Sequence, residues 1–222
     1  MGTSTVHRSP PTPRWRIVNN LYENPDVQPD LLLAEIFNAA EDYPARLADQ
    51  AILGRVEAVL DTARAGEWQS GNDAALAAAR AAVRSAQTRA LGAGLASFYG
   101  DLADRAVHTS IAGAARDPNT LATPPQVLGT FLSNLVAIAI EHVVSRDITA
   151  HVGGRGITNV ASALGLKRQL VERARAVASD ARLAEALYAA ADRPQEVWPA
   201  LVARVWRLGA ALPAGGETGP PS

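Results

Sequence analysis

The sequence predicts an all-α protein, a bundle of about seven or eight helices packed around one central apolar helix. Apolar residues recur at helical spacing along most of the chain, whereas the period-2 alternation of β-branched residues that marks strands is missing. The segment 127–140 is apolar on most sides, and a helix of that kind is buried at the centre of a fold. These patterns together define the expected fold class.

The chain has 222 residues, enough to bury a substantial core, and its 48% hydrophobic and 19% charged content is typical of a globular protein. We expect a single helical domain over residues 14–212, within which residues 157–212 are a candidate C-terminal subdomain. Residues 1–13 are expected to form a disordered tail and residues 213–222 a flexible one. The absence of cysteine excludes disulfides and cysteine nucleophiles and fits a cytoplasmic location.

The N-terminal part of the chain predicts three helices separated by proline and glycine signals. The first covers residues 15–22 and ends at Asn24-Pro25. The second covers residues 29–43 and ends there because the residue before a proline is biased away from helical backbone. The third covers residues 44–65, with its apolar side chains near one stripe.

The middle of the chain predicts a long, alanine-rich helical stretch over residues 74–115. An unbroken helix of this length would span about 60 Å, which is long for one domain. Gly92, Gly94 and Gly100 each weaken a helix by about 1 kcal/mol relative to alanine. We therefore expect two helices that meet around residues 92–100, or an extended bundle.

The central helix is expected over residues 124–151. Thr123 can cap it, prolines are tolerated in its first turn, and Gln126 occupies the capping-box position. Its apolar run, 127–140, is interrupted by small and polar residues and is too short to cross a bilayer, which takes about 20 residues. We therefore expect a core helix and no membrane partner. The interrupting residues are Gly129, Thr130, Ser133 and Asn134.

The last third predicts a helical region over residues 157–191 and a final helix with a wide apolar face. The final helix is expected to begin at Pro194, where the sequence repeats the helix-start pattern seen before the central helix. If Pro199 delays the start, the helix begins at about Trp198.

Residues 157–176 resemble a helix-turn-helix segment. Ala161 occupies the position where a small residue lets two helices cross, and Gly165 the position of the tight turn. The second helix would then enter a groove of double-stranded DNA and contact phosphates or base edges, with Gln169 as a base reader. The candidate DNA-contact residues are Lys167, Arg168, Gln169, Arg173 and Arg175.

A second interpretation of these residues is a short helix, a glycine break and an amphipathic helix packed on the core. Leu170 favours it, because that position is usually polar in a DNA-facing helix. The apolar stripe of this segment serves either interpretation. Its members are Leu166, Leu170, Ala174 and Val177.

Charge is unevenly distributed along a chain whose net charge is −1. Residues 23–67 contain ten acidic and three basic residues, whereas residues 155–178 contain five basic residues and one acidic residue. Such asymmetry is typical of an acidic partner surface and a basic contact surface, or of solvated helix faces.

No pattern in the sequence predicts a catalytic, metal or cofactor site. The best metal candidates are Glu141, His142, Asp147 and His151, but His142 and His151 would lie on nearly opposite sides of one helix. The glycine-rich segment 153–156 could cradle an anion. It does not follow a strand, so a connector between helices is the favoured interpretation.

The leading functional hypothesis is a non-enzymatic helical interaction or assembly subunit that self-associates or docks on a larger protein complex. Tryptophan is enriched in interface hot spots, so the candidate protein interface is formed by Trp198, Val202 and Trp206. The first alternative is a DNA-binding regulator that uses residues 157–176, and the second is a small-molecule-binding bundle or enzyme. The first two hypotheses both predict a homo-oligomer.

Overall fold

The computed structural model describes residues 12–64, 98–116, 123–189 and 192–213, together with single helical positions between 77 and 88. Within these residues it contains nine α-helices, one 3₁₀ turn and no strand, which confirms the predicted all-α class. Both predicted tails lie almost entirely outside the described residues, and so do residues 92–97 of the predicted helix break, whereas residues 98–100 are helical.

Four helices form the N-terminal part of the structure. Their bounds are α1 (Pro13–Tyr22), α2 (Pro29–Ala39), α3 (Tyr43–Leu47) and α4 (Gln50–Arg64). The sequence predicted one helix over residues 44–65, whereas the chain turns at Ala48 and Asp49. The Asp49 carbonyl accepts the N–H of Ile52 at 2.9 Å and so starts α4, consistent with the preference for aspartate just before a helix.

Five helices form the rest of the described fold. Their bounds are α6 (Phe98–Arg116), α7 (Pro124–Ile148), α8 (Val160–Ala178), α9 (Ala181–Ala189) and α10 (Pro194–Ala210), with the 3₁₀ turn Thr149–His151 after α7. The region predicted as helical over 157–191 is divided at Ser179 and Asp180. Ser179 Oγ donates to the Ala176 carbonyl at 2.8 Å, and Asp180 Oδ1 accepts the Arg182 N–H at 2.9 Å. These contacts end α8 and start α9.

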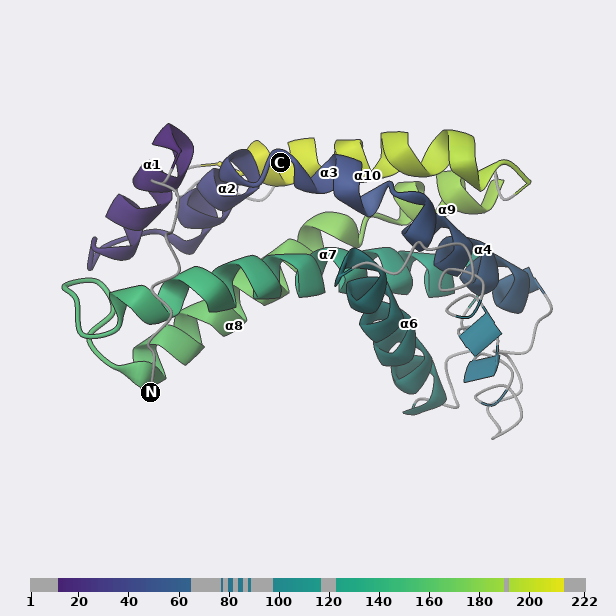
Figure 1. Ribbon diagram of the computed structural model, residues 1–222, viewed down its shortest axis with the longest axis horizontal. Helices are drawn as coiled ribbons and strands as arrows, with labels where there is room; N and C mark the ends of the chain where they lie inside the picture. The colour runs from purple at the N-terminus through teal and green to yellow at the C-terminus, as the bar shows by residue number, and fades with distance from the viewer. Residues whose placement is uncertain are drawn as a thin grey trace, which may run out of the picture.

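Helix α7 lies at the centre of the fold. Every residue from Phe131 to Ile140 is buried, and α4, α6, α8 and α9 pack against α7 (Figure 1). The predicted central apolar helix is therefore confirmed. At its start, Gln126 Oε1 accepts the Thr123 N–H at 2.7 Å, as the capping-box pattern predicted.

Helix α10 covers another side of the core against α2, α3 and α4. Figure 1 shows it running along the same edge of the molecule as α2 and α3. Trp198 Nε1 donates to the Leu47 carbonyl at 2.8 Å, and Trp206 Nε1 donates to the Phe37 carbonyl at 3.0 Å. Gly209 permits this close packing, because a Cβ there would lie 2.4 Å from the Phe37 ring.

A buried ion pair joins α4 to α6. Arg55 Nε lies 2.8 Å from Asp104 Oδ1, and Arg55 Nη2 lies 3.1 Å from Asp104 Oδ2. Farther along α6, Asn134 of α7 donates to Ser110 Oγ at 3.0 Å. Removing either member of such a buried pair leaves an uncompensated polar group. The two contacts therefore set the alignment of α6 with its neighbours.

Helix α7 is long and apolar enough, by length and composition alone, to span a membrane. The stretch that meets these criteria is Pro125–His151, which is longer than the apolar run 127–140. The prediction that this segment is too short to cross a bilayer is therefore wrong for the whole helix. Most of this stretch is buried against the other helices, and a central core helix meets the same criteria.

We predict that Leu135→Ala lowers the free energy of unfolding by about 2–5 kcal/mol, because it opens a cavity at the fully buried centre of α7. Urea denaturation monitored by circular dichroism measures the change. Leu208→Ala on α10 is the control, since Leu208 is 42% exposed and its truncation should change stability by about 0.5 kcal/mol or less. Equal losses for the two variants would contradict the central position of Leu135.

Candidate functional site

The segment that resembles a helix-turn-helix is one uninterrupted helix. Asn159 caps α8 by accepting the Ser162 N–H at 2.9 Å, and the helix continues through Gly165, so the predicted glycine turn is wrong. Glycine costs this helix about 1 kcal/mol relative to alanine. Burial of Leu170 and Ala174 against neighbouring helices stabilises the helix across that position. The second interpretation is wrong about the glycine break as well, whereas its amphipathic helix packed on the core is present.

The candidate DNA-contact residues do not form one free basic face on α8. Arg168 and Gln169 are exposed, and Arg168 has no ion pair within the described part of the chain. The other three side chains are paired with acids of the same chain, which offsets much of the positive charge noted in the sequence. The pairs are Lys167 with Glu141, Arg173 with Asp30, and Arg175 with Glu172.

The residues predicted as a protein interface on the last helix belong to the core. Trp198, Val202 and Trp206 are 0%, 1% and 4% exposed, and both indole N–H groups are bonded to carbonyls within the chain. In this fold they present no surface to a partner. Sequence alone could not separate the two roles, because a tryptophan stripe serves a core and an interface equally well.

Large exposed apolar side chains are found at the start of α8. Val160 is 63% exposed and Leu164 is 57% exposed, the highest values among the large apolar residues that the structure describes. Both belong to a row of exposed residues spaced four apart, and side chains at that spacing form one ridge along a helix. This α8 row consists of Val160, Leu164, Arg168, Glu172 and Ala176.

The glycine-rich segment after α7 packs on the end of α1. A Cβ on Gly156 would lie 2.2 Å from the Tyr22 carbonyl oxygen, so the approach requires glycine. His151 Nδ1 donates to Glu23 Oε1 at 2.7 Å. This hydrogen bond, and then one from the Arg155 backbone, lower the pKa of Glu23. The anionic group beside the glycine-rich segment is thus the Glu23 carboxylate of the same chain. The segment acts as a connector.

The four side chains considered as metal candidates make separate contacts. Glu141 pairs with Arg105 and Lys167, His142 packs on Phe98, Asp147 pairs with Arg146, and His151 pairs with Glu23. No three histidine or acidic residues in the described part of the chain are grouped so that they could hold a metal ion.

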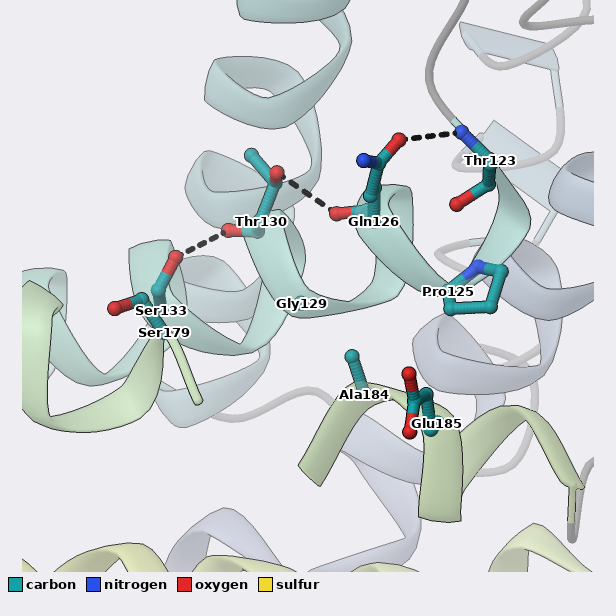
Figure 2. Close-up of a pocket in the computed structure, with 9 residues that line it drawn as sticks. All are labelled: Thr123, Pro125, Gln126, Gly129, Thr130, Ser133, Ser179, Ala184 and Glu185. Carbon is teal, nitrogen blue, oxygen red and sulfur yellow. Dashed lines mark hydrogen bonds between the residues drawn. The ribbon is translucent and has the colours of Figure 1, made fainter. Parts of the chain in front are cut away.

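A cavity that the sequence did not predict lies between α7 and α9 (Figure 2). Its volume is about 410 Å³. In the sequence, the cavity was indicated by Thr130 and Ser133, two polar residues within the apolar run 127–140. That they lie beside α9 depends on the tertiary structure. The lining residues are Thr123, Pro125, Gln126, Gly129, Thr130, Ser133, Ser179, Ala184 and Glu185.

Within the described part of the chain, the α8 row and the α7–α9 cavity are therefore surface features for which the internal packing supplies no role. No protein-family model, curated protein or solved structure matches this chain. A function is consequently inferred from its own residues and their geometry.

We predict that Glu23→Gln weakens the acid dependence of stability. A carboxylate whose pKa is lowered by folding stabilises the folded state above its unfolded pKa, and this contribution is lost as the pH falls through the folded pKa. The stability difference between the wild type and Glu23→Gln should therefore shrink as the pH falls below about 4.5, the ordinary value for this group.

Urea denaturation between pH 3 and pH 7 measures this difference. Glu57→Gln, on the exposed side of α4, is the matched control. A stability difference for Glu23→Gln that stays constant over this range would show that the His151 contact does not lower the pKa of Glu23.

Proposed function

We propose that this protein is a non-enzymatic helical assembly subunit that self-associates through the α8 row. The observation that carries the proposal is the exposure of Val160 and Leu164, one turn apart, on a helix whose opposite side is packed against α7. A rigid helix that presents adjacent large apolar side chains to solvent is typical of a protein contact surface.

The α8 row is complementary to itself when two copies run antiparallel. If the two-fold axis passes between Arg168 and Glu172, the Arg168 side chain of each copy faces Glu172 of the other. The same register places each Leu164 opposite the small Ala176 of the second copy, while each Val160 lies opposite position 180, just beyond the end of α8. A two-fold contact uses one surface patch on both subunits, so a self-complementary row favours a second copy as the partner.

The surroundings of the row favour close approach of two helices. Gly165, beside Leu164, has open space where a Cβ would lie, and Ala161 on the same side is exposed. Small residues next to a ridge form a groove that receives the ridge of another helix. Glu172 is held by Arg175 at 2.8 Å, which orients its carboxylate before association.

We predict that Arg168→Glu and Glu172→Arg each weaken self-association about tenfold, because each change replaces two ion pairs at the dimer interface with two like-charge contacts. The double variant Arg168→Glu/Glu172→Arg restores both pairs with reversed polarity and should recover most of the lost affinity. Sedimentation velocity of the full chain over a concentration series measures the dissociation constants.

Arg204→Glu is the matched control, because Arg204 is exposed on α10 and does not belong to the α8 row. Circular dichroism establishes that each variant remains folded. A chain that stays monomeric at high concentration, or a double variant no better than the single variants, would overturn self-association through this row. Assembly on a different protein would then be the remaining form of the interaction hypothesis.

Fluorescence anisotropy of labelled duplex DNA, at low and near-physiological salt, distinguishes the DNA-binding alternative from the assembly proposal. Association with DNA that falls steeply with salt and is lost in Lys167→Glu/Arg168→Glu would overturn the purely assembly-based proposal. We expect weak binding or none, because Lys167, Arg173 and Arg175 are already paired with acids of the chain.

A further inference from the structure

Val160 and the α7–α9 cavity lie at opposite ends of α8. Val160 is the first residue of this helix and is 63% exposed, whereas Ser179, which lines the cavity, directly follows the last residue. Because α8 has 19 residues, its two ends are about 28 Å apart. Figure 1 likewise shows the start of α8 far from α9. Val160 therefore does not reach the cavity of its own chain.

An antiparallel second copy brings these two ends together. Residues seven apart lie on nearly the same side of an α-helix. Ala161 precedes Arg168 by this spacing, and Ser179 follows Glu172 by it. With the two-fold axis between Arg168 and Glu172, Ala161 and Ser179 each lie about 14 Å from the axis along α8 and face one another across the pair. Val160 of each copy then lies at the edge of the cavity of the other.

Part of the cavity wall matches an apolar side chain. Pro125 and Ala184 contribute carbon surface, and Gly129 adds no side chain where α7 approaches α9. The volume of about 410 Å³ leaves room for a side chain from the first turn of another helix. Figure 2 shows Ala184 of α9 facing the start of α7 across this space. Removal of an exposed valine from water into such a site is favourable.

The hydroxyl groups of the cavity tolerate being covered, because their hydrogens are already donated to the backbone. Thr130 Oγ1 donates to the Gln126 carbonyl at 2.9 Å, and Ser133 Oγ donates to the Thr130 carbonyl at 3.0 Å (Figure 2). Ser179 Oγ donates to the Ala176 carbonyl at 2.8 Å. An apolar group placed over this wall therefore leaves none of these hydroxyl donors unsatisfied.

The charges at the two ends of α8 are complementary. Glu185, in the cavity lining, is exposed and has no hydrogen bond or ion pair within the described part of the chain. The start of α8 is the positive end of that helix, and Asn159 satisfies only one of its N–H groups, that of Ser162. Arg155, in the connector just before α8, is also exposed. A second copy thus brings positive charge towards an unpaired carboxylate.

We propose that the α7–α9 cavity receives the start of α8 of a second copy. Val160 of that copy inserts between α7 and α9, and Glu185 lies beside the positive end of the inserted helix. This inference rests on the proposed self-association through the α8 row and adds a contact at each end of the pair. By two-fold symmetry the dimer contains two such contacts, and each cavity is complete only when the second copy is bound.

A chain without cysteine permits a disulfide test of this contact. The full-length variant Val160→Cys/Glu185→Cys is incubated with oxidised glutathione, and covalent dimer is measured by electrophoresis without reductant. A disulfide requires Cα atoms within about 7 Å, so the two thiols of one chain cannot pair. We expect covalent dimer at least about tenfold faster than in the control, because the dimer holds the two thiols at high effective concentration.

Val160→Cys/Ala186→Cys is the matched control, since Ala186 is exposed on α9 next to Glu185 but does not line the cavity. Circular dichroism establishes that both variants are folded, and sedimentation velocity under reducing conditions measures their self-association. A chain that dimerises and is dissociated by Arg168→Glu, yet crosslinks no faster through Glu185→Cys than through Ala186→Cys, would overturn the insertion into the cavity and leave the α8 row proposal in place. A chain that stays monomeric would overturn both.

Discussion

The fold depends on one constraint, which is that the centre of α7 has no face in solvent. Every side chain from Phe131 to Ile140 is buried, so neighbouring helices must cover that segment on all sides. Burial of apolar surface is non-directional, and several arrangements of helices could satisfy it. The apolar centre therefore requires a bundle but does not by itself select the arrangement of its helices.

Polar contacts within the core select among those arrangements. The ion pair between Arg55 and Asp104 requires α4 and α6 to align so that both hydrogen bonds form, since an unpaired buried charge is costly. The indole N–H groups of Trp198 and Trp206 have the same effect on α10. Each must reach a carbonyl of the layer formed by α2 and α3. These directional contacts make the apolar packing specific.

The two surfaces that carry the proposals arise from this packing. Helix α8 buries Leu170 and Ala174 against its neighbours and leaves the α8 row in solvent. The cavity forms where α7 changes from its apolar centre to the polar residues near its start and where Ala184 of α9 approaches Gly129. Both features lie on well-packed helices, and a rigid scaffold presents a contact surface at a lower entropic cost than a loop does.

The sequence by itself determined the all-α class, the central position of α7 and its capping by Thr123, and it indicated Pro194 as one of two alternative starts of α10. These features depend on periodicity and capping, which are local properties of the chain. The uninterrupted course of α8 through Gly165 was decided by the tertiary structure, because packing outweighs the local cost of a glycine.

Burial decided the functional surfaces as well. Trp198 and Trp206 became core residues because α2 and α3 cover them, and Lys167 and Arg173 became paired because α7 and α2 place acids beside them. Thr130 and Ser133 share a cavity with Glu185 because α9 folds back onto α7. None of these encounters is encoded at short range, and only the three-dimensional packing of distant segments brings these residues together.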